Sequence, residues 1–166
     1  MDYKDIIKTL GLMPHPKEGG YFLETYRSDE NIHLNSLPEK YSQNKAFSTA
    51  IYYMLTSETK SAMHRIISDE IFHFYSGDPV EMLQLYPDGS HKIIIIGSDI
   101  SAGQIPQVIV PAGVWQGSRL IIGGKYALMG TTVAPAFDYS DYEHGDFTEL
   151  VSAYPSCENI LRLLCM

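Results

Sequence analysis

Short runs of β-branched and aromatic residues, separated by residues that favour turns, occupy most of this chain. The expected strands cover residues 21–27, 47–55, 61–67, 70–76, 80–86, 91–96, 107–110, 119–122 and 125–133. Segments such as Gly77-Asp78-Pro79 and Pro87-Asp88-Gly89 stand between them and have the composition of hairpin turns. This regular alternation of short strands and turns predicts an all-β fold, either a sandwich or a barrel.

Helices are expected only near the two ends of the sequence. Asp2 can cap a short first helix, and Gly11 is placed to end it in a left-handed conformation. Pro155 can begin a last helix with apolar residues at positions 160, 161 and 164. No linker, repeat or low-complexity tract interrupts the chain, so we expect one domain over residues 1–166.

The negative net charge of the chain limits the kinds of molecule that it is expected to bind. The net charge is −8, and the Lys and Arg residues number only 12 and are scattered, which disfavours nucleic acids and anionic membranes as partners. The N-terminus lacks the pattern of a signal peptide, and the longest aliphatic run, Ile93 to Ile96, is too short to span a bilayer. We therefore expect a cytoplasmic protein that binds a small molecule. Cys157 and Cys165 are too far apart along the expected helix to form a disulfide.

Two segments combine chemically active side chains with turn residues. In residues 61–77, His64 precedes Glu70 by six positions. In residues 111–117, a Pro-x-Gly turn is followed by Trp115 and Gln116. Because side chains alternate along a strand, His64 and Glu70 are the natural pair to point into a barrel, while His73 should point outwards.

The chain resembles the cupin superfamily, and more narrowly its small bacterial and fungal group of unknown function (DUF985, the cupin 5 family). The resemblance covers nearly the whole chain and is carried by His15-Pro16, Glu18 to Tyr21, Glu24 to Arg27, Thr49 to Tyr52, His64-Arg65, Asp69-Glu70 with His73, Gly77 to Pro79, Pro111 to Gln116, Ala134-Pro135 and Phe137-Asp138. It implies a cupin double-stranded β-helix, a jelly-roll barrel with short N- and C-terminal helices, assembled as a homodimer. The chain departs from the pattern at Lys17, which interrupts the His-Pro-Glu-Gly-Gly run, and at Ala136, which stands where glycine is common.

The resemblance also implies a metal site from which part of the ligand set is missing. Ile66 stands where the cupin motif has a second histidine, and Gln116 stands where it has the last one. His64, Glu70 and the amide oxygen of Gln116, with His73 as a further candidate, could form only a weak divalent metal site, because an amide is a poorer ligand than imidazole. The cofactor stays unknown, and a His64–Glu70 hydrogen bond without metal is the favoured interpretation.

The residues leave three functions open. In the first, His64 is a general base whose tautomer is fixed by Glu70 or Asp69, as required of an isomerase or epimerase that acts on a small polar or sugar-like metabolite. In the second, the same pair lies in the wall of a ligand-binding cupin that catalyses nothing. In the third, His64, Glu70 and Gln116 serve a metal-dependent oxygenase or lyase. The cupin fold does not decide between them, because related barrels include sugar-nucleotide epimerases, seed storage proteins and oxygenases.

Five side chains are expected to contact the ligand. Gln116 and Trp115 follow a turn at the barrel mouth, where Tyr52 would join them. Phe137 begins a segment that could cover the mouth as a lid. Arg27, on an early strand that crosses to the partner subunit in this group, could clamp an anionic group of the substrate.

An excess of apolar residues supports the expected homodimer. The four consecutive isoleucines from Ile93 to Ile96 cannot all point into one barrel, because side chains alternate along a strand. A second subunit could cover the isoleucines that face outwards or could pair with the strand at residues 21–27.

Overall fold

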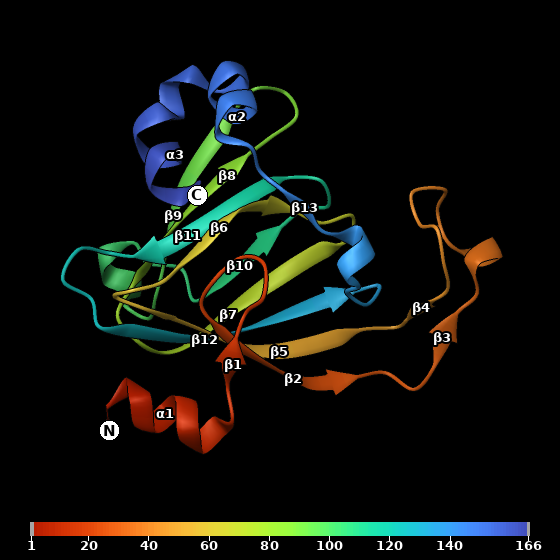
Figure 1. The fold of residues 1–166 in the computed structure, drawn as a ribbon, viewed down its shortest axis with the longest axis horizontal. Helices are drawn as coiled ribbons and strands as arrows, with labels where there is room; N and C mark the ends of the chain where they lie inside the picture. Colours follow the sequence, from red (N-terminus) through yellow and green to blue (C-terminus); the bar gives the residue numbers. More distant parts are fainter. Residues whose placement is uncertain (1, 166) are drawn as a thin grey trace.

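Two antiparallel sheets form a barrel in the computed structural model, which describes residues 2–165 (Figure 1). The six-stranded sheet has the order β1 (Met13–Pro14), β2 (Tyr21–Arg27), β5 (Thr49–Thr56), β12 (Tyr126–Ala134), β7 (Asp69–Gly77) and β10 (Gln107–Val110). The five-stranded sheet has the order β13 (Glu143–His144), β6 (Lys60–Arg65), β11 (Trp115–Leu120), β8 (Val80–Leu85) and β9 (His91–Ile96). A separate pair, β3 (Asn31–Ile32) with β4 (Lys45–Ala46), lies between β2 and β5 in the sequence.

The main hydrophobic core fills the space between the two sheets. Alternate side chains of each strand point inwards, as the period of two residues requires. The buried cluster includes Tyr53, Leu55, Phe72, Val80, Met82, Ile96, Val108, Val110 and Met129, which come from both sheets. This arrangement confirms the expected all-β fold and jelly-roll barrel.

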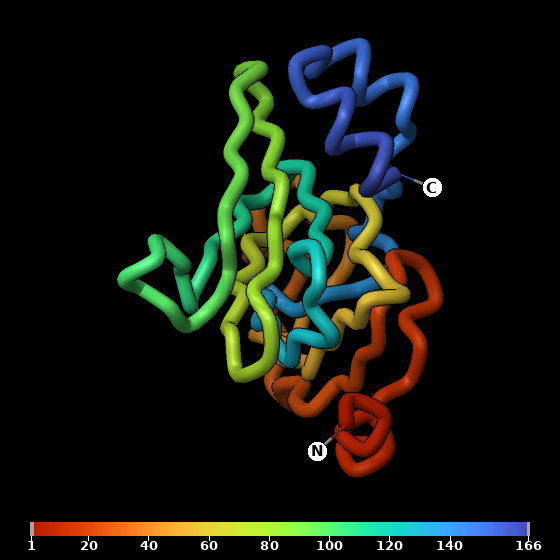
Figure 2. The backbone as a smooth tube through the Cα atoms, turned by 90° about the vertical axis from the view of Figure 1, so that its left-hand side faces the viewer, coloured from red at the N-terminus to blue at the C-terminus, as the bar shows by residue number. Residues whose placement is uncertain are grey.

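The helices lie at opposite ends of the barrel (Figure 2). The first, α1 (Tyr3–Leu10), ends at Gly11 in the expected left-handed conformation, whereas Asp2 occupies the N-cap position without a side-chain capping bond. At the other end, α2 (Phe147–Ala153) and α3 (Glu158–Leu164) cover residues of the five-stranded sheet such as Met63 and Leu83. No helix within residues 2–165 combines the length and apolar character needed to cross a membrane.

Helix α2 is not predicted by the sequence pattern, because residues 134–154 show no clear hydrophobic period. Its start is nevertheless marked by a capping residue: the Asp146 side chain accepts a hydrogen bond from the backbone N–H of Glu149. The expected last helix does form, since the turn of 3₁₀ helix η4 (Pro155–Cys157) leads directly into α3. Cys157 and Cys165 are both buried and are not joined in a disulfide.

The strand expected at residues 119–122 instead begins at Trp115 and ends at Leu120. The reason is Gly117, a residue type that favours turns but that lies inside β11 against β6. A Cβ atom at Gly117 would lie 2.6 Å from the Sδ atom of Met63 and 3.2 Å from the carbonyl oxygen of Ser61, so a side chain here would require the buried Met63 side chain to move. Trp115 and Gln116 are therefore strand residues and not turn residues.

The four consecutive isoleucines of β9 alternate between the two sides of the sheet. Ile96 is fully buried and Ile94 packs against the main core, whereas Ile93 is exposed on the other side. This confirms the expectation that they cannot all point into the barrel.

Candidate functional site

A pocket opens between the two sheets and has a volume of about 130 Å³. Its polar lining consists of His15, Glu18, Glu24, Arg27, Thr49, His64, Glu70, Thr131 and Asp138. Its apolar and aromatic lining consists of Phe22, Ile51, Ile66, Val133, Phe137, Tyr139 and Tyr142. The combination of an apolar wall with a few convergent polar groups is typical of a site for a small molecule.

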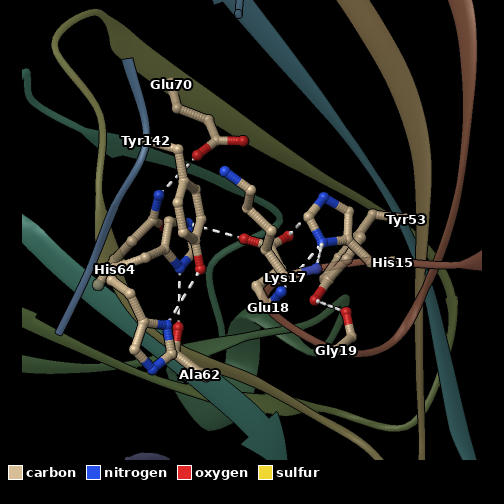
Figure 3. A network of polar contacts seen from close by, with 11 residues as sticks. His15, Lys17, Glu18, Gly19, Tyr53, Ala62, His64, Glu70 and Tyr142 are labelled. Carbon is tan, nitrogen blue, oxygen red and sulfur yellow. Dashed lines mark hydrogen bonds and ion pairs between the residues drawn. The ribbon is translucent and has the colours of Figure 1, made fainter. Parts of the chain in front are cut away.

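His64 lies on β6, is buried, and makes two hydrogen bonds through its ring (Figure 3). Its Nδ1 atom is 2.8 Å from the carbonyl oxygen of Ala62, and its Nε2 atom is 2.9 Å from Oε2 of Glu18. Both partners are acceptors, so both ring nitrogens donate and the ring is an imidazolium cation. Burial alone would lower the pKa of His64, but the Glu18 carboxylate raises it to about 9. His64 therefore has no lone pair free to take a proton from a ligand.

The partner of His64 is thus Glu18. The sequence pattern had predicted Glu70. Burial would raise the pKa of Glu18, but the charge and hydrogen bond of His64 lower it below its usual value. The change of partner has a simple geometric cause. Glu18 reaches His64 from the turn that precedes β2, far away in the sequence, and takes the role of partner that was expected of Glu70 or Asp69.

The turn that carries Glu18 is fixed from both sides. The backbone N–H of Glu18 donates to Nδ1 of His15 at 3.1 Å, and the Tyr53 hydroxyl donates to the carbonyl of Gly19 at 2.9 Å. Gly19 has a φ of 96°, and a Cβ atom there would lie 2.4 Å from the carbonyl oxygen of Lys60. Only glycine fits this position, so the Glu-Gly-Gly run serves to place a carboxylate beside His64. That run was the sequence signal for Glu18, although only the tertiary contact with His64 reveals its chemical role.

Glu70 lies on β7, is only 8% exposed, and lines the pocket together with Ile66 and Val133. Gln116 donates a hydrogen bond from Nε2 to Oε2 of Glu70 at 2.6 Å. Burial, followed by the nearby charge of Glu18, raises the pKa of Glu70, and the charge of His64 together with the hydrogen bonds from Gln116 and Thr131 offsets only part of this rise. The site therefore holds one carboxylate with a lowered pKa and one with a raised pKa.

Gln116 supports Glu70 from behind and does not line the pocket. It is 1% exposed and stands opposite His64 across the β6–β11 pair. The expected position on a turn at the mouth is wrong, because β11 already begins at Trp115.

Trp115 and Tyr52 do not reach the pocket either. Trp115 precedes the buried Gln116, and Tyr52 follows Ile51, which lines the pocket. Because side chains alternate along a strand, Trp115 and Tyr52 both point outwards. The Trp115 ring lies 4.5 Å from the guanidinium carbon of Arg65 and packs with the C-terminal helices. The Tyr52 ring packs edge-to-face on Tyr75 with 6.1 Å between centroids.

The segment after β12 lines the pocket, in the place expected of a lid. The Tyr142 ring stacks on His64 with 5.2 Å between centroids, and the Tyr139 ring packs against Phe137. The ammonium of Lys17 lies 5.1 Å and 5.3 Å from the Tyr139 and Tyr142 ring centroids. An ion pair between the buried side chains of Lys45 and Asp141 fastens the segment to β4. The lid is thus anchored at its base and contacts the site through aromatic rings.

Arg27 lies at the rim of the pocket, but its charge is already paired. Its Nε and Nη2 atoms donate to the two carboxyl oxygens of Glu24 at 3.0 Å and 2.8 Å. Nη2 also donates to the carbonyl of Phe137 at 3.2 Å. Arg27 therefore holds the lid to β2, and the geometry gives little support to its expected role as a clamp for an anion.

The residues of the pocket do not fit a metal ion. Within residues 2–165, no three His, Cys, Asp or Glu side chains are arranged so that they could hold one. Both nitrogens of His64 already bond to acceptors, the amide nitrogen of Gln116 points at Glu70, and Ile66 is apolar. His73 points out of the barrel, where its Nε2 atom lies 3.3 Å from Oγ1 of Thr132. His64, Glu70 and Gln116 are therefore neighbours, but they do not present free ligand atoms to a common point, and His73 lies apart from them.

Comparison with known proteins agrees with the fold. Residues 4–145 match the family model described as the cupin superfamily (DUF985). The chain belongs to this family. An uncharacterized protein of Saccharomyces cerevisiae is 30% identical to this cupin over 147 residues, which cover 84% of this chain and 73% of the yeast protein.

Solved structures resemble this cupin over its full length. A hypothetical protein from Leishmania major has a TM-score of 0.88 and 28% identity, with 99% of each chain covered. A protein from Shewanella oneidensis has a TM-score of 0.86 and 28% identity, with 100% and 98% covered. Oxalate decarboxylase from Bacillus subtilis has a TM-score of 0.55 but only 11% identity, with 92% of this chain and 37% of that chain covered, so it shares the fold alone.

Replacing Gln116 with Leu tests the support of Glu70. We expect the free energy of unfolding to fall by about 1–3 kcal/mol, because the buried Glu70 carboxyl loses a hydrogen-bond donor. Urea denaturation measures this change. Gln43→Leu is the control, since Gln43 is exposed and its loss should change stability by less than about 0.5 kcal/mol. Equal stability of the wild type and Gln116→Leu would show that the Gln116–Glu70 contact does not support the site.

Proposed function

We propose that this cupin binds a small uncharged or cationic metabolite in the pocket and transfers a proton on it, as isomerases and epimerases do. The observation that carries the proposal is Glu70, a buried carboxyl of the pocket lining with no ion-pair partner among residues 2–165, whereas Glu18 and Glu24 are both paired. A raised pKa on a carboxylate beside a fixed cation is an arrangement that suits acid–base chemistry.

In this proposal the roles differ from those expected from the sequence. Glu70 is the general base, because a carboxylate of raised pKa is a stronger base than an ordinary one once it is ionised. His64 stays protonated and, since both of its ring N–H groups already donate to Ala62 and Glu18, it acts on negative charge that develops on the ligand only through its positive charge. Tyr142, whose pKa is raised by burial, remains a neutral phenol over the His64 ring.

The charges around the pocket support an uncharged or cationic ligand. Glu18 is paired with His64, and Glu24 is paired with Arg27, so these four charges balance. Glu70 and Asp138 remain in the lining as acids without an ion-pair partner among residues 2–165, and the Lys17 ammonium over the Tyr139 and Tyr142 rings offsets one of these two charges. An anionic ligand would meet like charge at Glu70, whereas an apolar body with a hydrogen-bond donor fits both Glu70 and the aromatic walls.

Three ligands of one shape test the charge preference: cyclohexylamine, cyclohexanol and cyclohexanecarboxylate. We expect the amine and the alcohol to raise the melting temperature and the carboxylate to leave it unchanged, because only the carboxylate repels Glu70. Thermal denaturation with increasing ligand measures the effect through the binding linkage. Stabilisation by the carboxylate alone would contradict the assigned charge preference.

Proton transfer itself is tested with hydroxyacetone in D₂O, followed by NMR. We expect the protein to accelerate exchange of the carbon-bound protons beside the carbonyl, because Glu70 can remove one of them. If hydroxyacetone binds, as seen in its own ligand-induced shifts, and exchange is not accelerated, the second candidate function, a ligand-binding cupin without catalysis, is favoured.

A further inference from the structure

One histidine of the pocket lining has no role in the proposed reaction. His15 lies in the loop between β1 and β2, and its backbone N–H donates to the carbonyl oxygen of Gly20 at 2.9 Å. Its Nδ1 atom accepts the backbone N–H groups of Glu18 at 3.1 Å and Lys17 at 3.4 Å. The ring is thus folded back over its own loop, which occupies one of its two ring nitrogens.

The hydrogen bonds of this loop fix where the proton of His15 lies. Because Nδ1 accepts from backbone donors, its lone pair is in use and the neutral ring carries its proton on Nε2. Burial lowers the pKa of His15, and the opposing effect of the Glu18 carboxylate is smaller. At neutral pH, His15 is therefore an uncharged imidazole with one N–H group, at Nε2.

The Nε2–H group of His15 makes no hydrogen bond to residues 2–165. The Nε2 atom lies 3.9 Å from Oε1 of Glu18, which is longer than a hydrogen bond, and Oε2 of the same carboxylate already binds His64. Both N–H groups of His64, in contrast, donate to protein acceptors. Of the two histidines in the lining, only His15 has an N–H group left for a ligand.

Aromatic neighbours hold the His15 ring in one orientation beside Glu18 (Figure 3). The centroid of the His15 ring lies 4.8 Å from that of Phe22 and 6.4 Å from that of Tyr53, and both contacts are edge-to-face. The ring of Tyr139 in the lid lies 6.1 Å away. Phe22 and Tyr139 also line the pocket, so His15 is part of a packed wall. A donor that is fixed in this way needs no rearrangement when a ligand binds.

We propose that the ligand of this pocket carries a carbonyl group, and that the Nε2–H group of His15 donates a hydrogen bond to its oxygen. This rests on the proposed function, in which Glu70 removes a proton beside a carbonyl. The electron pair of the broken C–H bond then forms the C=C bond of an enolate, and the carbonyl π electrons move to the oxygen. His15 stabilises that oxygen without giving up its proton, and return of the proton from Glu70 to carbon restores the carbonyl.

Two substitutions separate the donor at Nε2 from the acceptor at Nδ1. In His15→Asn, the amide oxygen can still accept the backbone N–H of Glu18, but the donor at the Nε2 position is lost. In His15→Gln, the longer side chain can place an N–H group near that position, but the loop loses its acceptor. If His15 only held the loop, Asn would be the milder change. If His15 binds the carbonyl, Gln is the milder change.

Binding of cyclohexanone and cyclohexylamine, measured by the rise in melting temperature, tests the proposal. We expect His15→Asn to weaken cyclohexanone binding about tenfold, because one hydrogen bond is lost, and His15→Gln to weaken it less. Both variants should bind the amine like the wild type, because the amine contacts Glu70. Acceleration of exchange on hydroxyacetone should fall about a hundredfold in His15→Asn. His91→Asn, the same change at an exposed histidine of β9, is the control and should alter neither ligand's binding.

A structural readout accompanies the binding measurements. The dependence of stability on pH between 6.5 and 9, which reports the His64–Glu18 pair, should be unchanged in His15→Asn, because Glu18 keeps its loop. Equal cyclohexanone binding by the wild type and His15→Asn would overturn the inference. So would a wild type that does not bind cyclohexanone, or a greater loss of binding in His15→Gln than in His15→Asn. Cyclohexanone binding that depends on His15 in a wild type without accelerated exchange would contradict the proposed catalysis and support the inference.

Discussion

The Glu18→Gln variant is expected to lose about 3 kcal/mol of unfolding free energy at neutral pH, because the fold then contains a buried His64 without its counter-ion. The size of the effect follows from the pKa of His64, which the folded protein raises from 6.5 to about 9. Each pKa unit corresponds to about 1.4 kcal/mol of differential interaction. The neutral glutamine cannot stabilise the imidazolium in this way.

The same pair sets how stability depends on pH. The folded pKa of His64 is above its unfolded value, so its contribution is complete below pH 6.5 and is lost as the pH rises through about 9. We therefore expect wild-type stability to fall between pH 6.5 and 9, and this fall to be much smaller in Glu18→Gln. Urea denaturation across that range measures both slopes.

Glu24→Gln is the matched control for Glu18→Gln. It makes the same substitution in an ion pair that is largely exposed to solvent. An exposed pair contributes about 0–1 kcal/mol, so the loss of stability should be small and the pH slope should be unchanged. If Glu18→Gln kept the wild-type slope, His64 would not be an imidazolium held by Glu18.

If Glu70 is the base that we propose, the Glu70→Gln variant loses the acceleration of proton exchange, while its fold stays as stable as the wild type or becomes more stable. A glutamine of the same shape still accepts the hydrogen bond from Gln116 and removes a carboxyl that burial disfavours as an anion. Without a base, acceleration of proton exchange on hydroxyacetone should fall about a hundredfold or more. The combination of lost activity and retained stability is typical of residues kept for function.

Binding of the amine probe gives Glu70 a second readout. The pKa of Glu70 is raised above its usual range. Cyclohexylamine should therefore bind more tightly as the pH rises through the pKa of Glu70 and the carboxylate forms. This dependence should disappear in Glu70→Gln and persist in Glu143→Gln, which alters an exposed acid that pairs with Arg65. If Glu70→Gln accelerated proton exchange on hydroxyacetone as much as the wild type and bound cyclohexylamine with the same pH dependence, Glu70 would not be the functional carboxyl.

The order of the strands along the chain was predictable because it depends on local signals. Strands such as Tyr21–Arg27, His91–Ile96 and Gln107–Val110 have the predicted bounds, since β-branched residues and turn glycines act over a few neighbours. The inward orientation of His64 and Glu70 also followed from the period of two residues. The motifs of the resemblance were specific enough to identify the cupin family by themselves.

Which side chains meet inside the barrel depends on contacts between distant segments, and only the tertiary structure decided it. Glu18 reaches His64 because a glycine turn passes against Lys60, and no local pattern encodes that approach. Trp115 turns outwards because it belongs to β11, beside the buried Gln116, and neighbouring residues of a strand face opposite sides. The sequence by itself therefore determined the barrel and its two inward groups, while the partner of each group was decided by how the sheets close on one another.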